Sequence, residues 1–266
     1  MNVVVCALAK KEHKYIDDWV KWYLSIGVDK IFLFDNDELG YPYIGDYITN
    51  KESVEIIDVR GIVGKTIQTD FYNRFYGKYG DTFDWCLFVD IDEFLQVDDI
   101  HEFLSNDIYN DYEQIRVMWK LFGDDDLIER DESLPVYKAF VKPVKKSYSR
   151  DLVHKGNLEI QGKCIVKGHL KDIVFGSVHY ASRNGETIKS CLPDGTLTNS
   201  KVAIKEPYNS NIYLNHYMTK TLKEFIEQKL NRSDAVYGYN LKINYFWRIN
   251  TITYQKMLYL KNKGII

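Results

Sequence analysis

Three acidic residues within the segment 88–94 have the types and spacing that point most directly to chemistry. Asp90, Asp92 and Glu93 follow the apolar run Trp85–Val89, which is typical of a buried strand. Carboxylates buried without partners are very costly, so these side chains must reach solvent or a cation. Asp90 and Asp92 stand at positions i and i+2, which share one side of an extended backbone. We therefore expect them to converge on one Mg²⁺ or Mn²⁺ ion that bridges a diphosphate.

A second acidic strand end follows the apolar run 31–34. Asp35, Asn36 and Asp37 stand there, and ligands of open α/β sheets bind outside the carboxyl ends of the strands. Asp35 either binds a ribose hydroxyl or a base edge, or belongs to a simple turn. The acids at 90–93 have an alternative too, which is to cap the next helix.

The first hundred residues alternate between apolar runs and helical patterns. The sequence predicts strands over 3–8, 31–34, 54–59 and 85–89, with helices over 15–26 and around 67–75. Continuous rather than alternating apolar strands indicate a largely parallel sheet that is covered by helices. Gly27 is expected to end the first helix.

After residue 100 the predicted elements are more mixed. We expect a short helix over 100–104, capped by Asp98 or Asp99. The predicted strands, antiparallel or mixed, lie near 115–119, 136–144, 162–166 and 173–180. Helices follow from residue 219, with a last helix or helix pair over 241–261. The predicted fold class is therefore α/β, with a helical C-terminal extension.

Composition narrows the classes of protein. The chain has 266 residues and 35 basic against 38 acidic residues, a net charge of −3 that argues against a nucleic-acid binder. Its four cysteines are widely spaced, which fits a reducing compartment better than disulfides or zinc. No signal peptide or membrane span is predicted. We expect a cytoplasmic protein, with peripheral contact at the inner face of the membrane as an open alternative.

Four blocks of the sequence resemble the family 2-like and family 92 glycosyltransferases. The first is the opening pattern over 7–36, and the second is Trp85–Leu95, which looks like the DxD metal-binding strand of those enzymes. The third is Trp119-Lys120-Leu121-Phe122-Gly123, and the fourth runs from Leu214-Asn215-His216-Tyr217 to Arg232. Thr221 and Ser233 depart from the usual Ser and Gly of the fourth block.

This resemblance implies a GT-A (Rossmann-like) fold. Residues 1–218 would form the glycosyltransferase domain, with a nucleotide-sugar half over 1–100 and an acceptor half over 101–218. Residues 219–266 would pack on it as a helical extension. The activity implied is a metal-dependent, inverting transfer of a sugar from a nucleoside-diphosphate donor, expected to be a UDP-sugar, to a saccharide or lipid-linked acceptor.

The resemblance also implies roles for individual residues. Asp35 would lie near the nucleobase or ribose, with a loop over Ala7–Lys10 beside it. Asp90 would contact the ribose or the metal shell, and Asp92 would bind the metal, Mn²⁺ or Mg²⁺. His216 would complete the metal shell or contact the diphosphate.

Further candidates are less specific. Gln68 either faces the nucleotide or lies on a helix surface. Lys163 would balance the charge of the departing diphosphate, and His179 would belong to the same site. Trp119 and Phe122 either stack on a sugar or fill the core. The general base is expected among three adjacent acids: Asp124, Asp125 and Asp126.

Two other function classes remain open from the sequence. A metal-dependent phosphodiesterase or nuclease could use the same acids, although it would favour two metal ions. A non-catalytic carbohydrate-binding protein could keep the fold without the reaction. Donor sugar, acceptor and oligomeric state are beyond what the sequence predicts.

Overall fold

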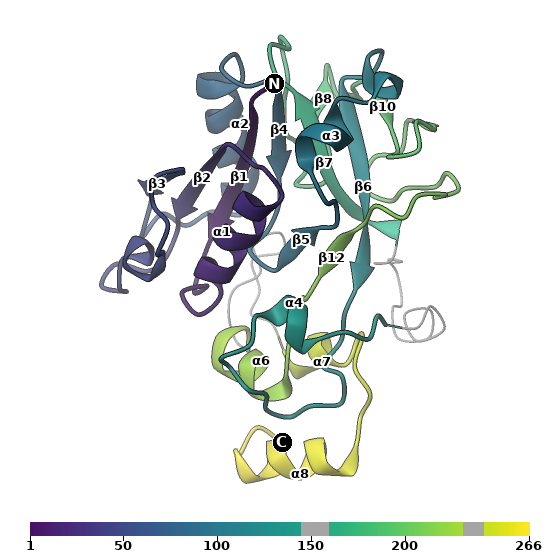
Figure 1. The fold of residues 1–266 in the computed structure, drawn as a ribbon. Coiled ribbons are helices and arrows are strands. Elements are labelled where there is room, and N and C mark those ends of the chain that lie inside the picture. The colour runs from purple at the N-terminus through teal and green to yellow at the C-terminus, as the bar shows by residue number, and fades with distance from the viewer. Residues whose placement is uncertain (145–159, 231–241) are drawn as a thin grey trace. The chain divides into compact units, whose positions relative to one another are not determined.

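The computed structural model describes residues 1–144, 160–230 and 242–266 (Figure 1). The described helices are α1 (Ile16–Ser25), α2 (Ile67–Tyr79), α3 (Ile100–Leu104), α4 (Val136–Ala139), α6 (Leu222–Gln228), α7 (Ile243–Phe246) and α8 (Tyr254–Asn262), with 3₁₀ turns η1 (Ile44–Tyr47) and η2 (Asp107–Tyr109). The described strands are β1 (Val3–Ala9), β2 (Lys30–Asp35), β3 (Val54–Asp58), β4 (Trp85–Phe88), β5 (Glu93–Leu95), β6 (Gln114–Leu121), β7 (Gly162–Lys167), β8 (Ser182–Arg183), β9 (Glu186–Thr187), β10 (Ser190–Cys191), β11 (Leu197–Thr198) and β12 (Leu214–His216). The protein is a mixed α/β structure.

The central sheet is largely parallel. Its described strands follow the order β11-β10-β6-β7-β4-β1-β2-β3, and β12 pairs with β5 and β6 beside this path. β1 runs parallel to both of its neighbours, β2 and β4, and β2 runs parallel to β3. β7 is antiparallel to β4 and to β6. The predicted parallel half and the mixed second half are both confirmed.

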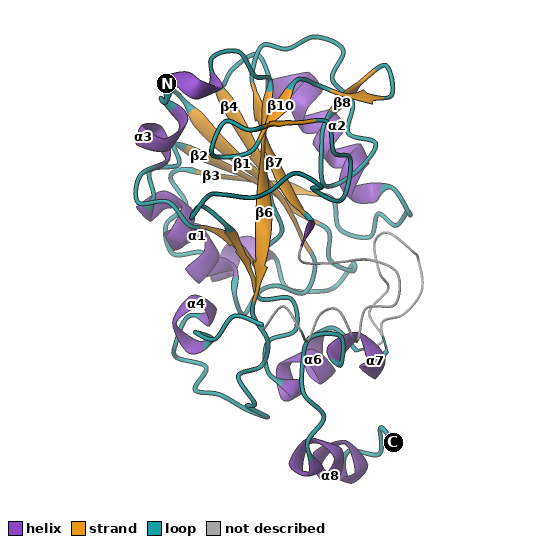
Figure 2. Cartoon of the chain, turned by 90° about the vertical axis from the view of Figure 1, so that its right-hand side faces the viewer, coloured by secondary structure: helices purple, strands orange, loops and turns teal. Residues whose placement is uncertain are grey.

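Helices cover the sheet on both faces, as Figure 2 shows for α1 and α2. The face under α2 forms an aromatic core in which Phe71, Phe75 and Phe88 are buried together with Phe32 and Phe34. The next residues along β1 and β2 point to the opposite face because side chains alternate along a strand. Both faces of β1, β2 and β4 are therefore buried, which explains their continuous apolar sequences.

The end of α1 follows the predicted cap. Gly27 adopts φ +94°, a left-handed conformation that L-residues with a side chain rarely take. The Gly27 N–H donates to the carbonyl of Leu24 (3.2 Å), and the Val28 N–H donates to that of Tyr23 (3.1 Å). This pair of bonds is the Schellman arrangement, and it turns the chain into β2.

The chain forms two compact units. The first comprises Met1–Trp119 and Ile160–Asn215, and the second comprises Lys120–Glu159 and His216–Ile266. This division differs from the predicted one at residues 100 and 218. The reason lies within the second unit, where the loop after β6 is ion-paired to the C-terminal part of the chain through Asp124–Lys256 and Arg130–Glu224.

Two predicted strands are wrong. The segment 136–144 begins as the short helix α4, because Pro135 precedes it with a φ of −54° and lacks the N–H that a helix start leaves unbonded. The segment 173–180 forms a single bridge, between Val174 and Ser182, instead of a strand. The predicted C-terminal pair of helices is confirmed as α7 and α8, although residue 241 lies outside the described residues, as do Arg232 and Ser233.

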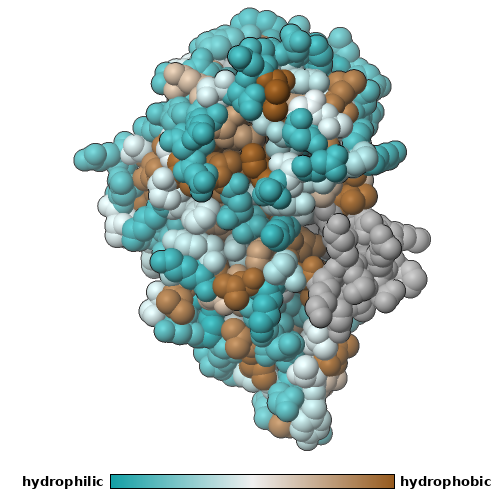
Figure 3. Space-filling model, turned by 45° about the vertical axis from the view of Figure 1, so that its right-hand side comes forward, coloured by the Kyte–Doolittle hydropathy of each residue, from teal (hydrophilic) through white to brown (hydrophobic). Residues whose placement is uncertain are grey.

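The molecular surface carries both polar and apolar side chains. On the face drawn in Figure 3, apolar side chains lie among polar ones, as is usual for a folded protein. Among the described residues, none of the helices combines the length and the apolar character needed to cross a bilayer.

Candidate active site at the carboxyl edge of the sheet

The parallel strands end together at one edge of the sheet. In the strand registers Ala9 is opposite Asp35, which in turn is opposite Asp58, and Cys6 is opposite Phe88. The segments that leave β1, β2, β3 and β4 therefore start from the same edge. β7 runs the other way and begins there, since Cys164 is opposite Phe88. This edge is where open α/β sheets bind their ligands.

A cluster of polar side chains surrounds Asp90 just after β4. Its Oδ2 forms an ion pair with Lys163 Nζ at 2.9 Å, and its Oδ1 accepts a hydrogen bond from Gln68 Nε2 at 2.5 Å. Gln68 lies on α2 and also donates to the hydroxyl of Tyr72 at 2.8 Å. Three predicted site residues, Asp90, Gln68 and Lys163, thus lie in contact. The Asp90 side chain is 34% exposed, so the cluster opens to solvent there.

Glu93 is the buried partner of this cluster. Its Oε2 accepts from the backbone N–H of Asp90 at 2.8 Å and lies 4.0 Å from Lys163 Nζ. Burial raises the pKa of the Glu93 carboxyl well above its ordinary value, which the nearby ammonium opposes in part. Burial also lowers the pKa of Lys163, but the carboxylates of Asp90 and Glu93 outweigh this and the pKa is raised. Lys163 is therefore a fixed, buried cation.

The segment 90–93 is a turn rather than an extended strand end. The Glu93 N–H donates to the Asp90 carbonyl at 3.1 Å. Trp19 Nε1 donates to the same carbonyl at 3.1 Å and to the Glu93 carbonyl at 3.2 Å, and the Tyr23 hydroxyl donates to the latter. The expectation that Asp90 and Asp92 share one side of an extended backbone is wrong, because β4 ends at Phe88. Helix α1 holds the turn in place instead.

The donor chemistry of this turn fits a hard divalent cation. Asp90 and Asp92 contribute carboxylate oxygens from one turn, and oxygen donors suit Mg²⁺ and Mn²⁺. Over residues 1–144, 160–230 and 242–266, no group of three or more His, Cys, Asp or Glu side chains is arranged to hold a metal. Mg²⁺ is often held by one or two carboxylates together with substrate phosphates. The predicted metal site at Asp90 and Asp92 stays a prediction.

His179 and Trp119 lie beside the start of β7. His179 Nδ1 donates to the Gly162 carbonyl at 2.8 Å, and its ring stands edge-on to Trp119 with the ring centroids 5.4 Å apart. Burial and the nearby Lys163 ammonium lower the His179 pKa to about 4, so the ring is neutral near neutral pH. Gly162 itself is required, since a Cβ there would lie 1.9 Å from the Val117 carbonyl oxygen.

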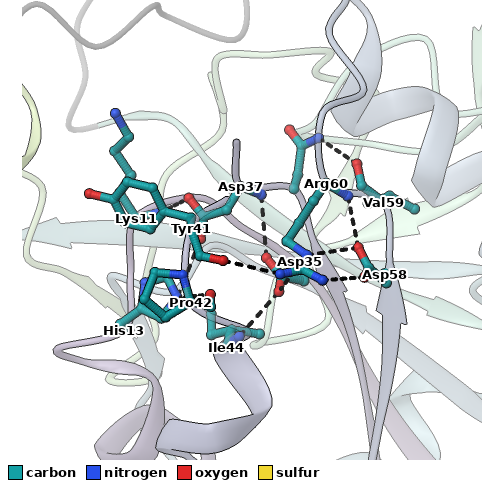
Figure 4. A network of polar contacts seen from close by, with 11 residues as sticks. Lys11, His13, Asp35, Asp37, Tyr41, Pro42, Ile44, Asp58, Val59 and Arg60 are labelled. Carbon is teal, nitrogen blue, oxygen red and sulfur yellow. Dashed lines mark hydrogen bonds and ion pairs between the residues drawn. The ribbon is translucent and has the colours of Figure 1, made fainter. Parts of the chain in front are cut away.

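The second acidic strand end forms a network of its own (Figure 4). Asp35 is fully buried, and its carboxylate accepts from the backbone N–H groups of Ile44 (3.2 Å) and Asp37 (3.3 Å). Arg60 lies 3.9 Å from it and pairs more closely with Asp58. The Asp35 carboxylate thus organises the loop after β2, which is the turn alternative that the sequence left open.

Sequence reasoning missed His13 and Asp37 as partners. Asp37 Oδ1 accepts from the Lys11 N–H at 2.9 Å, and His13 Nε2 lies 3.6 Å from Asp37 Oδ2 while donating to the Pro42 carbonyl at 2.8 Å. Burial raises the Asp37 pKa, partly offset by the Lys11 N–H. Lys11 reaches this position with φ +59°. No local pattern signals contacts between loops that lie 26 residues apart.

The predicted loop over Ala7–Lys10 is wrong for most of its length. β1 continues to Ala9, and Ala7 is fully buried opposite Leu33. Lys10 is the first residue beyond the strand and stands at the carboxyl edge. Its predicted contact with a nucleotide stays a prediction.

The predicted base candidates lie in the second unit. Asp124 is buried, and its Oδ2 is 2.5 Å from Lys256 Nζ; burial nevertheless raises the Asp124 pKa. Asp125 Oδ2 accepts from the backbone N–H of Val141 at 3.1 Å. Asp126 has a largely exposed side chain. Of the three acids, Asp126 has the most exposed side chain and Asp125 is partly exposed.

His216 also belongs to the second unit. It ends β12, and its carbonyl accepts from the Phe122 N–H at 3.0 Å. Phe122 stacks on Tyr217 at a centroid distance of 4.9 Å, so the core role of this aromatic residue is the one observed. The predicted role of His216 at a metal stays a prediction.

Two comparisons with known proteins found no match. No protein-family model matches the sequence, and no curated protein is similar enough to count as a match. The resemblance of the four blocks to glycosyltransferases therefore remains an expectation.

Proposed function

We propose that this protein is a metal-dependent glycosyltransferase with a GT-A organisation. It would transfer a sugar from a nucleoside-diphosphate donor, expected to be UDP-linked, to a saccharide or lipid-linked acceptor. The observation that carries this proposal is the cluster of Asp90, Gln68 and Lys163 at the carboxyl edge of a parallel sheet, next to the turn that contains Asp92. That edge also holds the loops after β1 and β2, which can surround a nucleotide.

Lys163 has the properties needed to stabilise a departing diphosphate. Its ammonium is buried, charged and fixed by Asp90 at 2.9 Å. A preoriented cation stabilises developing negative charge without the cost of reorganising solvent. When bound, a divalent ion held by Asp90 and Asp92 would add positive charge beside the same diphosphate.

The proposed reaction is a single displacement at the anomeric carbon. The acceptor oxygen forms a bond to that carbon while the bond from the carbon to the diphosphate oxygen breaks, and the electron pair leaves with the diphosphate. A carboxylate takes the acceptor proton. Asp126 is the base candidate we carry forward, because its side chain is 71% exposed, whereas Asp124 is buried against Lys256. Lys256 Nζ also lies 3.4 Å from Asp126 Oδ1, so this cation is beside the proposed base.

Donor binding tests the proposal. Thermal shifts are measured with a panel of nucleotide sugars, with and without Mn²⁺, because a ligand of the native state raises the unfolding temperature by mass action. We expect a Mn²⁺-dependent rise with one donor, lost in Asp92→Asn. Asp172→Asn is the matched control, since Asp172 is exposed and its φ of +58° suits Asn.

Transfer assays then separate the alternatives. Radiolabelled donor is followed for transfer and hydrolysis in the wild type and in Asp92→Asn and Asp126→Asn. An unchanged rate in Asp92→Asn contradicts the metal assignment. Cleavage of a phosphodiester without a sugar donor would support a phosphodiesterase instead, and sugar binding without nucleotide binding would support a carbohydrate-binding protein.

A further inference from the structure

Helix α8 turns an apolar stripe toward solvent. Tyr254, Met257, Leu258 and Lys261 follow the spacing i, i+3, i+4 and i+7, which places them on one side of a helix. All four are exposed, Tyr254 at 76% and Leu258 at 44%. The opposite side of α8 buries Lys256 and Leu260. This helix therefore has its larger apolar side chains outside, and an exposed apolar patch calls for an explanation.

All charged residues in the sequence around α8 are basic. Residues 235–266 contain five Lys or Arg and no Asp or Glu. The second unit as a whole has 17 basic and 11 acidic residues, a net charge of +6, against 18 basic and 27 acidic residues and −9 in the first unit. The net charge of −3 thus hides a strongly cationic second unit.

Acidic neighbours of α8 lie on another side of the helix. Asp126 and Glu129 line a shallow groove together with Gln255 and Tyr259. Asp124 faces the buried Lys256. By the helical period, Gln255 and Tyr259 are displaced from the stripe of Tyr254, Met257, Leu258 and Lys261, so the acids do not cover it.

We infer that the exposed stripe of α8 docks on an anionic lipid surface. Tyr254, Met257 and Leu258 would enter the boundary between headgroups and acyl chains, while Lys261, exposed on the same stripe, would contact the anionic headgroups. The basic residues of the segment 235–266 and the exposed apolar side chains of the stripe each favour an anionic lipid surface. Together they favour it over a polar partner. This surface goes beyond the proposed transfer reaction and does not depend on it.

Sedimentation with lipid vesicles tests the inference on the full chain. Vesicles of phosphatidylcholine alone are compared with vesicles that also contain phosphatidylglycerol, at low and high salt. We expect binding to the anionic vesicles that weakens with salt. Leu258→Asp and Tyr254→Asp should each lower the partition coefficient about tenfold, because they replace buried apolar area by a charge.

Matched controls come from the first unit. Val63 is 83% exposed, so Val63→Asp makes the same kind of change away from α8. Lys51→Glu is the control for Lys261→Glu, since both lysines are exposed. Circular dichroism shows whether each variant is folded. We expect both controls to bind vesicles as the wild type does.

Three kinds of result would overturn the inference. The first is equal binding to neutral and anionic vesicles, or none to either. The second is equal loss in Val63→Asp and Leu258→Asp. The third is a dimer in analytical ultracentrifugation that Leu258→Asp dissociates, or tight binding to a nucleic-acid duplex without vesicle binding, because either would assign the stripe to another partner. All these readouts are independent of transferase activity.

Discussion

Lys163 balances two carboxylates, one partly exposed and one fully buried. Its Nζ is 2.9 Å from Asp90 Oδ2 and 4.0 Å from Glu93 Oε2, and the side chain is 1% exposed. Removing one partner of a buried ion pair leaves an uncompensated charge. We therefore expect Lys163→Met to lower the free energy of unfolding at neutral pH, by less than the roughly 3–5 kcal/mol of a fully buried pair because Asp90 is 34% exposed. Urea unfolding followed by circular dichroism measures this loss.

An exposed ion pair provides the control for Lys163→Met. Lys171 and Asp81 also lie 2.9 Å apart, but their side chains are 76% and 64% exposed. Lys171→Met should change stability by less than about 1 kcal/mol, because solvent screens such pairs. Adding Asp90→Asn to Lys163→Met should restore part of the lost stability. A double variant as unstable as the single one would mean that Lys163 acts by packing rather than by charge.

His179 should make stability depend on pH. Its pKa is about 4 in the folded chain, lowered by burial and by Lys163, against about 6.5 for an unperturbed histidine. Between these values the unfolded chain binds more protons, so stability is fully present above about pH 6.5 and falls as the pH drops toward 4. The loss attributable to His179 is about 3 kcal/mol.

The asparagine variant isolates this contribution. His179→Asn keeps an N–H donor for the Gly162 carbonyl but does not titrate. Urea unfolding of both proteins across this pH range should show a shallower acid loss in the variant. Identical pH profiles would contradict a buried neutral His179.

At the scale of the elements, the first half of the fold was predictable because its strands are buried on both faces. Such strands have continuous apolar sequences, as β1, β2 and β4 show. The segments 136–144 and 173–180 were misjudged because a short apolar run does not distinguish a strand from a short helix or a loop. Pro135 was the local signal for α4.

The candidate site was predictable where topology alone brings residues together. Asp90 follows a buried strand, and both Gln68 and Lys163 reach it from elements next to that strand, 22 residues before Asp90 and 73 after it. The role of Glu93 was missed because it depends on a turn instead of an extended strand end. The contact between His13 and Asp37 was missed because two loops form it, and loops have no periodic pattern.

Helix α6 depends on a reciprocal cap at its start. Thr221 Oγ1 accepts from the Glu224 N–H at 3.2 Å, and Glu224 Oε2 accepts from the Thr221 N–H at 3.1 Å. Thr221→Ala removes the hydroxyl and should cost about 1–2 kcal/mol of unfolding free energy. Thr221→Ser keeps the hydroxyl and should cost less, as urea unfolding will show. Equal losses in both variants would mean that the methyl group, not the cap, matters.

For the whole molecule, net charge is a poor guide to partners. The near-neutral total of −3 combines a first unit at −9 with a second unit at +6. The acidic unit contains the candidate site, where Lys163 lies among carboxylates. The basic unit contains α8 and its exposed stripe. Each unit therefore has its own electrostatic character, and a partner of either sign is compatible with the same total charge.

Stability of the whole sheet can be followed through its cysteines. Cys6, Cys86 and Cys164 are buried on the adjacent strands β1, β4 and β7, and Cys191 is buried on β10. Burial raises the pKa of all four thiols, to about 11 for Cys164 and about 12 for Cys191. Because the thiolate is the reactive form, native thiols should react only when the chain opens.

Labelling with a disulfide reagent measures this opening. In native buffer we expect the four thiols to react at least about a thousandfold more slowly than in urea, and at one common rate, because the sheet must unfold as a unit. Val63→Cys adds an exposed thiol that should react at once and so calibrates the reagent. If Cys191 alone labels early, the β10 edge opens before the parallel strands do. If Cys6 labels early, the central sheet is not the cooperative core that its burial indicates.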